Sequence, residues 1–222
     1  MATEAMIRVL SVTSECVPLV KTGGLADVAG ALPGAMAAQG WQVRTFLPGY
    51  PAVLAALSKP RTVLKDSDFF DGPVRVLAGQ GGGLDLLVLD APHLYDRHGS
   101  IYLDESGNDW SDNHLRFGAL CMAAAKVATD GAKRWKPEIV HCHDWQAGLV
   151  PLLIKKATQK NPPYCVMTIH NIAFQGLFHW STKNLFGVPD EFFTHNGAEC
   201  WGQCGFLKAG LAFSDKITTV SP

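Results

Sequence analysis

Lys21, Gly23 and Gly24 form the first combination in this sequence that could do chemistry. They lie in the stretch KTGGL, between an apolar run and a segment with a helical spacing of apolar residues. A helix start presents unpaired N–H groups and a partial positive charge, glycines allow a close approach to the backbone, and a lysine adds a full charge. The combination favours a phosphate or diphosphate. A tight strand-to-helix turn with a solvated lysine explains these three residues alone equally well.

The spacing of this loop differs from two common phosphate-binding motifs. Lys21 precedes the glycines, so the GxxxxGK[ST] motif is absent, and GxGxxG is absent as well. A dinucleotide-dependent dehydrogenase is therefore disfavoured. Asp27 falls in the first turn of the expected helix, where the helix dipole favours an acid. It either stabilises the helix or hydrogen-bonds a hydroxylated ligand.

Polar residues also follow two later apolar runs. In HCHD, His141 and His143 would share one face of a strand and could hold a metal, although a third ligand is not evident. Asp144 is placed either to cap the next helix or to contact a ligand. His170 and Asn171 end the following run, where a neutral histidine could hydrogen-bond a sugar hydroxyl.

The sequence shows no evident Ser–His–Asp or Cys–His arrangement and no convincing pair of acids. Three acids, Glu15, Asp27 and Asp144, could still converge at the strand ends. A second conceivable metal site, at Cys200 and Cys204 with His195 nearby, has no second pair at zinc spacing. We therefore expect no metal.

The composition excludes several classes of partner. The chain has 222 residues, of which 47% are hydrophobic and 18% charged, and its net charge is -1. This balance gives no support for nucleic acid or a membrane surface as a partner. The start MATEAMIRVL has no basic region followed by a signal core, so we expect a cytoplasmic protein. The six cysteines mostly sit in apolar runs and are expected to be buried thiols rather than disulfides.

The segments that position these residues alternate between strands and helices. Short apolar runs predict strands, and apolar residues three and four apart predict helices. The expected strands are 6–14, 41–48, 137–143, 164–170 and 216–220, with two more around a glycine-rich turn in 72–92. The expected helices are 25–39, 114–132, 144–159 and 205–214, and a long structured loop covers 93–113.

This alternation is typical of an α/β domain with a Rossmann-like, doubly wound and mostly parallel sheet. Such sheets bind ligands at the carboxyl ends of their strands. The places to look for a site are therefore the segments 11–24, 48–50, 90–96, 141–146 and 170–176. No linker or internal repeat divides the chain.

Several stretches together resemble the bacterial glycogen synthases and plant starch synthases. They are KTGGLADVAGALP, FLPGYP, DAPHLYDRHGSIYLDESGNDWSDNHLRF, HCHDWQAGLVP, TIHNIAFQG and FLKAGLAFSDKITTVSP. The resemblance implies a retaining glucosyltransferase that moves glucose from a nucleotide sugar, usually ADP-glucose, to the non-reducing end of an α-1,4-glucan. It also implies the glycosyltransferase B architecture, in which the active site lies between two Rossmann-like domains. No cofactor or metal is expected beside the donor substrate.

The resemblance also implies roles for individual residues. Lys21 looks like the family's lysine near the sugar-nucleotide phosphates, with the backbone amides of Gly23 and Gly24 beside it. Asp27 matches the acid of the same motif, and His170 matches the histidine that contacts the transferred glucose. We expect these last two to be catalytic.

Three further residues are expected to bind substrate in the same cleft, namely Tyr95, Asp144 and Asn171. Family members are longer than this chain, so the resemblance covers the N-terminal, acceptor-side domain, residues 1–222. The C-terminal domain normally supplies most nucleotide contacts, and without it we expect the chain to be inactive or nearly so. The alternative is a freestanding glucan-binding or regulatory module without catalysis.

Overall fold

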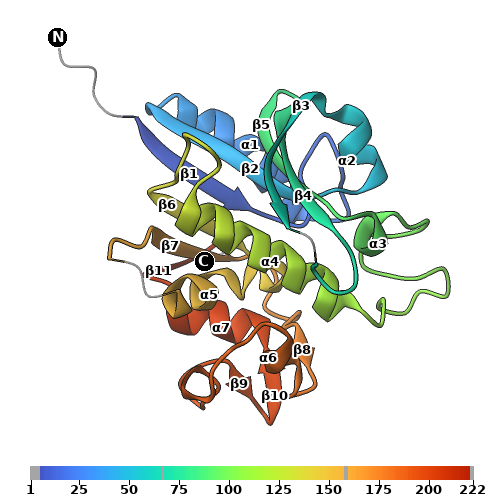
Figure 1. The fold of residues 1–222 in the computed structure, drawn as a ribbon, viewed down its shortest axis with the longest axis vertical. Helices are drawn as coiled ribbons and strands as arrows, with labels where there is room; N and C mark the ends of the chain where they lie inside the picture. Colours follow the sequence, from blue (N-terminus) through green and yellow to red (C-terminus); the bar gives the residue numbers. More distant parts are fainter. Residues whose placement is uncertain (1–5, 67, 158–159, 221–222) are drawn as a thin grey trace.

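The computed structural model describes residues 6–66, 68–157 and 160–220. Within these ranges one sheet has eight strands (Figure 1). They are β1 (Ile7–Val12), β2 (Trp41–Pro48), β3 (Ser58–Asp66), β4 (Val74–Gly81), β5 (Leu84–Asp90), β6 (Ile139–His143), β7 (Tyr164–Ile169) and β11 (Lys216–Thr219). Their order is β11-β7-β6-β1-β2-β5-β4-β3. From β11 to β5 the adjacent strands are parallel to one another, whereas β4 is antiparallel to β5 and β3 is antiparallel to β4.

Helices cover both faces of this sheet (Figure 1). They are α1 (Gly24–Ala37), α2 (Pro51–Ala56), α3 (Pro92–Tyr95), α4 (Asn113–Asp130), α5 (Val150–Lys156), α6 (Thr182–Leu185) and α7 (Phe206–Phe213). Parallel strands joined by right-handed crossovers place α1 and α4 on opposite faces, because the two connections move along the sheet in opposite directions. A small sheet of β8 (Leu177–Phe178), β9 (Glu199–Cys200) and β10 (Gln203–Gly205) lies beyond α7.

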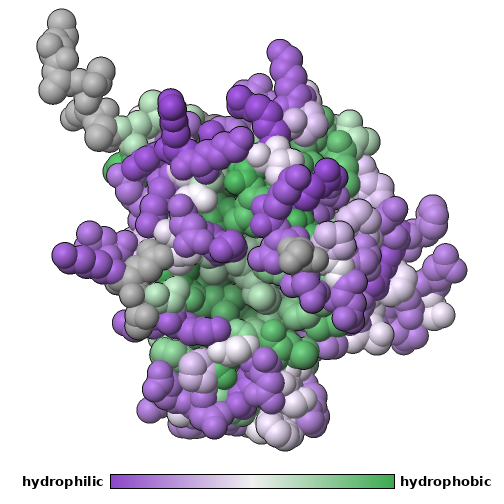
Figure 2. Space-filling model, viewed as in Figure 1, coloured by the Kyte–Doolittle hydropathy of each residue, from purple (hydrophilic) through white to green (hydrophobic). Residues whose placement is uncertain are grey.

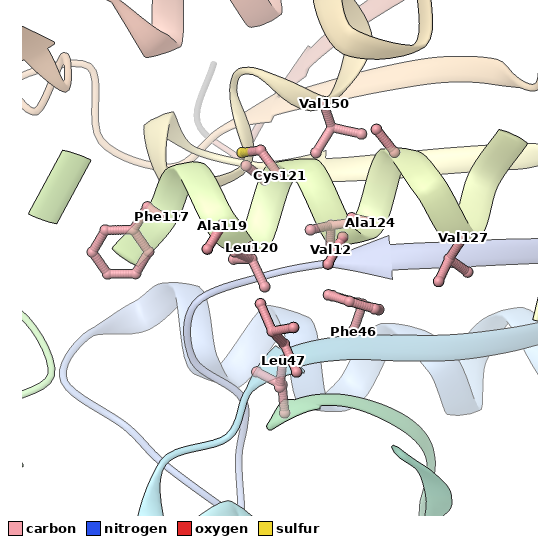
Figure 3. Close-up of a cluster of buried hydrophobic side chains, with 14 of the residues drawn as sticks. Val12, Phe46, Leu47, Phe117, Ala119, Leu120, Cys121, Ala124, Val127 and Val150 are labelled. Carbon is pink, nitrogen blue, oxygen red and sulfur yellow. The ribbon is translucent and has the colours of Figure 1, made fainter. Parts of the chain in front are cut away.

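The core lies between α4 and the middle of the large sheet (Figure 3). Leu120 and Ala124 of α4 point toward Val12 of β1 and Phe46 of β2, and all four side chains are fully buried. Burial of such side chains contributes roughly 25 cal/mol per Å² of apolar surface removed from water. The α4 packing therefore fixes β1 and β2, and the carboxyl end of β1 leads into the glycine loop discussed below.

The sequence predicted most of these elements. The strand predicted at 41–48 has the bounds of β2, and the glycine-rich turn joins β4 to β5 through Gly82 and Gly83. These two glycines have φ of 58° and 79°, the left-handed region that a two-residue hairpin loop requires. The helix predicted from 25 to 39 is α1, which contains Pro33 and ends at Ala37.

Other predictions of structure need correction. The helix predicted at 144–159 is a 3₁₀ turn, η1 (Trp145–Ala147), followed by α5, and residues 158–159 of that prediction lie outside the described part of the chain. The sequence did not predict α2, β3, α6 or the small sheet. Among the described residues, no helix combines the length and apolar character needed to cross a membrane.

Candidate functional site

The large sheet changes winding direction between β1 and β6. From β1 the chain moves through α1 to β2 on one side, whereas β6, β7 and β11 follow on the other side. The carboxyl ends of these strands meet around a cavity of about 450 Å³, here called the switch-point pocket. Crevices at such points are the usual ligand sites of open α/β sheets. The pocket is lined by Glu15, Thr22, Gly23, Gly24, Leu25, Val28, Tyr102, Asp144, Gln146, His170, Asn171, Phe174 and Val220.

Five of the residues predicted from the sequence line this pocket together. They are Gly23, Gly24, Asp144, His170 and Asn171. They come from the segments after β1, β6 and β7, which are far apart in the sequence and adjacent in the sheet. The order of the parallel strands brings them together, as the strand-end rule predicts.

Lys21 and Asp27 lie beside the pocket rather than among its lining residues. The Lys21 Nζ donates to both carboxylate oxygens of Asp27, at 2.7 and 2.8 Å, and both side chains are about half exposed. The predicted convergence of three acids is therefore correct for Glu15 and Asp144, which line the pocket, and wrong for Asp27.

The loop before α1 is already occupied by a carboxylate of the chain itself. Glu15 is 3% exposed, and its Oε2 accepts hydrogen bonds from the Thr22 hydroxyl at 2.9 Å, from the Gly23 amide at 3.2 Å and from the Thr22 amide. The Gly23 amide is thus engaged by Glu15, in contrast to the prediction that it faces a bound phosphate. The first turn of α1, starting at Gly24 and Leu25, has N–H groups without intrahelical partners and borders the pocket.

Tyr95 does not reach the switch-point pocket, in contrast to the prediction. It is 1% exposed, and its hydroxyl donates to the carbonyl of Arg116 at 2.6 Å inside the core. The tyrosine that lines the pocket is Tyr102, whose hydroxyl lies 2.7 Å from Ser14 Oγ and 3.4 Å from Glu15 Oε1. Burial raises the pKa of Tyr102 well above its usual value, so it stays protonated.

The segment that contains Tyr102 is held in place by Arg116 of α4. The Arg116 guanidinium is buried and donates to the carbonyls of Leu94 at 3.0 Å and Ile101 at 2.9 Å. The sequence motif HLYDRHGSIY contains both tyrosines, and nothing in its spacing shows which one returns to the sheet. A buried arginine that binds loop carbonyls is a signal that only the folded structure provides.

Asp144 does not cap the following 3₁₀ turn with its side chain, in contrast to one of the two sequence-based explanations. Its φ is 55°, and its Oδ1 accepts hydrogen bonds from the backbone amides of His170 at 2.7 Å and Asn171 at 3.3 Å. The carboxylate therefore ties the end of β6 to the turn after β7. Burial raises the pKa of Asp144, while the two amides and nearby His170 oppose that rise.

Three histidines lie in or beneath the pocket. His143 is fully buried, and its Nδ1 lies 2.9 Å from Nε2 of His170. The ring centroids of His141 and His143 lie 4.2 Å apart with the rings tilted by 36°, and His141 Nε2 lies 2.6 Å from Thr168 Oγ1. Burial lowers the pKa of His141 to about 4, that of His143 well below its usual value, and that of His170 in the same direction. All three are neutral near pH 7.

Neither conceivable metal site is supported by the structure. In the parts of the chain that the structure describes, no group of three or more histidine, cysteine or acidic side chains is placed to hold a metal ion. The six cysteines are free thiols, and five of them are buried, as the sequence predicted. Burial raises the pKa of the thiols of Cys16, Cys121 and Cys165 to about 12, which makes them unreactive.

A second cavity of about 300 Å³, here called the aromatic pocket, adjoins the first. The two share Phe174. Its walls combine aromatic rings with polar side chains, namely Trp110, Trp145, Phe174 and Phe178 with Asp109, Asn113 and Gln175. Aromatic faces beside amide and carboxylate groups suit a ligand that has both apolar and hydroxylated surfaces, as a sugar does.

A third hollow, between α4 and α5, lies apart from the two adjacent pockets and has a different lining. Figure 2 shows apolar residues gathered in the middle of this face, with hydrophilic residues around them. The hollow measures about 320 Å³, and two of its four charged residues, Lys126 and Asp130, pair with each other at 3.0 Å. It contains none of the residues that follow the parallel strands, so it offers no comparable chemistry.

The fold and the two adjacent pockets define a Rossmann-like domain with a candidate ligand site at its switch point. The family model described as starch synthase catalytic domain matches residues 8–222, so the chain belongs to this family of glycosyltransferases. It is 55% identical over 216 residues to the glycogen synthase of Roseobacter denitrificans and 53% identical over 217 residues to that of Paracoccus denitrificans. These alignments cover 97% and 98% of this chain and 45% and 46% of the relatives.

A solved structure shows the same fold. The catalytic domain of starch synthase IV from Arabidopsis thaliana, bound to ADP and acarbose, superposes with a TM-score of 0.83 at 25% identity. The match covers 98% of this chain and 45% of that one. It confirms the predicted fold class, a mostly parallel Rossmann-like sheet within the glycosyltransferase B architecture. The chain spans less than half the length of the curated relatives it matches.

Proposed function

We propose that residues 1–222 form the N-terminal, acceptor-side domain of a glycogen synthase. The reaction is the retaining transfer of glucose from ADP-glucose to the non-reducing end of an α-1,4-glucan. The observation that carries this proposal is the switch-point pocket, which joins His170, Asn171 and Asp144 to the start of α1. The sequence identity of 53–55% to two glycogen synthases supports the proposal.

The diphosphate of the donor would bind at the first turn of α1. Negative charge develops on the leaving ADP as the bond to glucose breaks, and groups already aimed at that charge stabilise the transition state. Here these groups are the unpaired N–H groups of the first turn, beginning at Gly24, and the ammonium of Lys21. Asp27 would hold Lys21 in position through its ion pair, rather than act on the sugar itself.

His170 would bind the transferred glucose in its neutral form. Burial lowers its pKa, so it offers hydrogen bonds to hydroxyl groups without a positive charge. Asp144 binds the backbone amides of His170 and Asn171, and this contact fixes both residues relative to the end of β6. Asp144 therefore supports sugar binding through the turn it holds.

The aromatic pocket would take the end of the acceptor glucan. Aromatic rings stack on the C–H faces of pyranose rings, and the polar groups Asn113 and Gln175 beside them can bind hydroxyls. Phe174 belongs to both pockets, so the end of a glucan bound there would lie next to the donor glucose. This arrangement is the one that glucosyl transfer requires.

We further propose that catalysis needs a second domain, which would hold most of the nucleotide. The relatives are about twice the length of this chain, and their additional half is the candidate for that role. The 222-residue chain alone would then bind glucan and show little or no transfer. No cofactor is proposed beside the ADP-glucose donor.

The test compares this chain with the same chain extended to the length of its relatives. The extended protein should incorporate radiolabelled glucose from ADP-glucose into glycogen, with UDP-glucose as the comparison donor, whereas the 222-residue chain should not. Transfer by the short chain above background would contradict the need for a second domain. Glucan binding by both proteins without transfer by either would overturn the proposed function in favour of a glucan-binding module.

A further inference from the structure

A line of three hydrogen-bonding side chains runs beneath the switch-point pocket. It starts at Ser11 of β1, passes through His143 of β6 and ends at His170 after β7. Ser11 Oγ lies 3.2 Å from His143 Nε2, and His143 Nδ1 lies 2.9 Å from His170 Nε2. Ser11 is 2% exposed and His143 is fully buried, so water does not compete for the bond between these two side chains.

The positions of the protons along this line follow from hydrogen-bonding capacity. A neutral imidazole has one N–H group and one bare nitrogen. In one order, the Ser11 hydroxyl donates to His143 Nε2, and His143 Nδ1–H donates to His170 Nε2. In the reverse order, His170 Nε2–H donates to His143 Nδ1, and His143 Nε2–H donates to Ser11.

Burial at Ser11 distinguishes the two orders. In the reverse order the Ser11 hydroxyl proton needs another acceptor, and the described hydrogen bonds of its Oγ include none besides His143. A buried donor without a partner is costly, whereas an unfilled lone pair on a hydroxyl oxygen is tolerated more often. The first order gives every proton between Ser11 and His170 an acceptor. In that order His170 Nε2 is bare, and its proton is on Nδ1.

We propose that His143 is a positioning residue that holds His170 in one ring orientation and as the Nδ1–H tautomer. His170 then presents a neutral N–H donor on its remaining ring nitrogen. The inference rests on the proposed function only where it assigns that donor to a hydroxyl of the transferred glucose. The tautomer itself is a property of the 222-residue chain and can be measured without any transfer reaction.

The lowered pKa of His143 agrees with the neutral tautomer that the geometry requires. Burial lowers the pKa of His143 well below its usual value, and the charges that His141 and His170 would carry lower it further. A charged His143 would have donors on both ring nitrogens and could not accept from Ser11. The ring of His141 packs against that of His143, with 4.2 Å between the ring centroids, and this contact restricts how His143 can turn.

The direct test is nitrogen NMR of the 222-residue chain labelled with ¹⁵N-histidine. Two-bond proton–nitrogen spectra distinguish a protonated ring nitrogen from a bare one. We expect His170 to carry its proton on Nδ1, with Nε2 bare, and His143 to have the same pattern. A proton on Nε2 of His170 in the wild-type chain would overturn the proposal.

A set of variants in the extended protein then tests the consequence for catalysis. His143→Asn can place an amide N–H near the position of Nδ1, His143→Gln places its amide nearer that of Nε2, and His143→Phe removes both groups. We expect His143→Phe and His143→Gln to lower kcat about tenfold with little change in KM, and His143→Asn to recover most of the loss. Equal losses in all three would show a merely structural role and overturn the proposal.

The double variant His143→Phe/His170→Ala shows whether His143 acts through His170. If it does, the double variant should have the kcat of His170→Ala alone. Multiplying effects would contradict the proposal. If His143→Phe fails to fold, His143→Asn and His143→Gln, combined in turn with His170→Ala, give the same comparison. If the extended protein shows no transfer at all, the proposed function fails, and the NMR result still decides the tautomer.

Discussion

The Glu15 carboxylate accepts a hydrogen bond from the Thr22 hydroxyl at 2.9 Å. This contact lies inside the glycine loop, for which the sequence suggested a site for a bound phosphate. The same oxygen accepts the amide of Gly23 at 3.2 Å. The chain thus supplies an internal anion to its own glycine loop. A diphosphate bound as proposed would therefore meet the N–H groups of the first turn of α1, which have no intrahelical partners.

Loss of the Glu15 side chain should destabilise the protein. Glu15→Ala leaves the donors of Thr22 and Gly23 without their partner in a part-buried place, so we expect the free energy of unfolding to fall by about 1–3 kcal/mol. Glu105→Ala, at an exposed glutamate, is the matched control. Chemical denaturation of both variants checks this, and indistinguishable midpoints would show that Glu15 does not hold the loop.

Lys21→Ala should impair donor use without unfolding the protein. The Lys21–Asp27 pair is exposed, and such pairs contribute at most about 1 kcal/mol to stability. In the extended protein we expect the KM for ADP-glucose to rise by about tenfold, with glucan affinity unchanged. Lys126→Ala breaks a similarly exposed pair with Asp130 and is the control. Equal steady-state constants for the two variants would remove Lys21 from the proposed site.

His170→Ala should lower turnover in the extended protein. The variant loses the ring that is proposed to bind the transferring glucose, and a tenfold or greater fall in kcat corresponds to at least about 1.4 kcal/mol of transition-state stabilisation. His195→Ala, at an exposed histidine, should leave kcat unchanged. A His170→Ala protein with full turnover and reduced thermal stability would instead assign His170 a purely structural role.

The stability of the chain should fall as the pH drops from about 6.5 to about 4. Burial lowers the pKa of His141 to about 4, so the unfolded chain takes up this proton first, near 6.5. The free energy of unfolding therefore falls between about pH 6.5 and about 4, and His141 causes no fall above pH 6.5. The pKa values of His143 and His170 are also lowered, which makes the fall in stability steeper. The nearby carboxylates of Asp144 and Glu15 partly oppose the lowering of the pKa of His170.

His141→Gln isolates one part of that pH dependence. Its amide can still bond Thr168, but it takes up no proton, so stability should fall less steeply between pH 6.5 and about 4 than in the wild type. Urea midpoints measured across this range provide the check, with His195→Gln as the control. An unchanged slope in His141→Gln would show that His141 does not titrate abnormally.

Two glycines should respond in opposite ways to alanine. A Cβ on Gly148 would lie 2.1 Å from the carbonyl oxygen of Phe206, so α7 must shift, and we expect a loss of about 1–3 kcal/mol. Gly34 of α1 has no atom within 4 Å of the same position, so alanine should stabilise the helix by about 0.5–1 kcal/mol. Thermal and chemical denaturation measure both. A stable Gly148→Ala protein would contradict the close packing of η1 on α7.

The residues at the strand ends could be predicted because that information is local. The apolar run of each parallel strand and the polar residue after it predict where Asp144 and His170 lie, and the fold class predicts that they meet. By contrast, β3 could not be predicted because its sequence, SKPRTVLKD, shows no clean alternation. It is a largely exposed edge strand that pairs, among the described residues, only with β4.

The identity of the pocket tyrosine could not be predicted from the sequence. Tyr95 lies in a single helical turn and packs edge-on against Tyr50 at 5.7 Å, whereas Tyr102 returns to the sheet because Arg116 binds the carbonyl of Ile101. That choice depends on a contact across the core. The filling of the glycine loop by Glu15 is hidden from the sequence for the same reason.

The imidazole and hydroxyl groups beneath the pocket can form their hydrogen bonds only when the strands pair in the correct register. Ser11 pairs with His141 across β1 and β6, and His143 pairs with Thr168 across β6 and β7. A slip by one residue would turn these polar groups into the apolar layer under α4. The orientation of His170 therefore depends on the correct register of β1, β6 and β7. A chain that folds with these strands out of register cannot have a well-formed site.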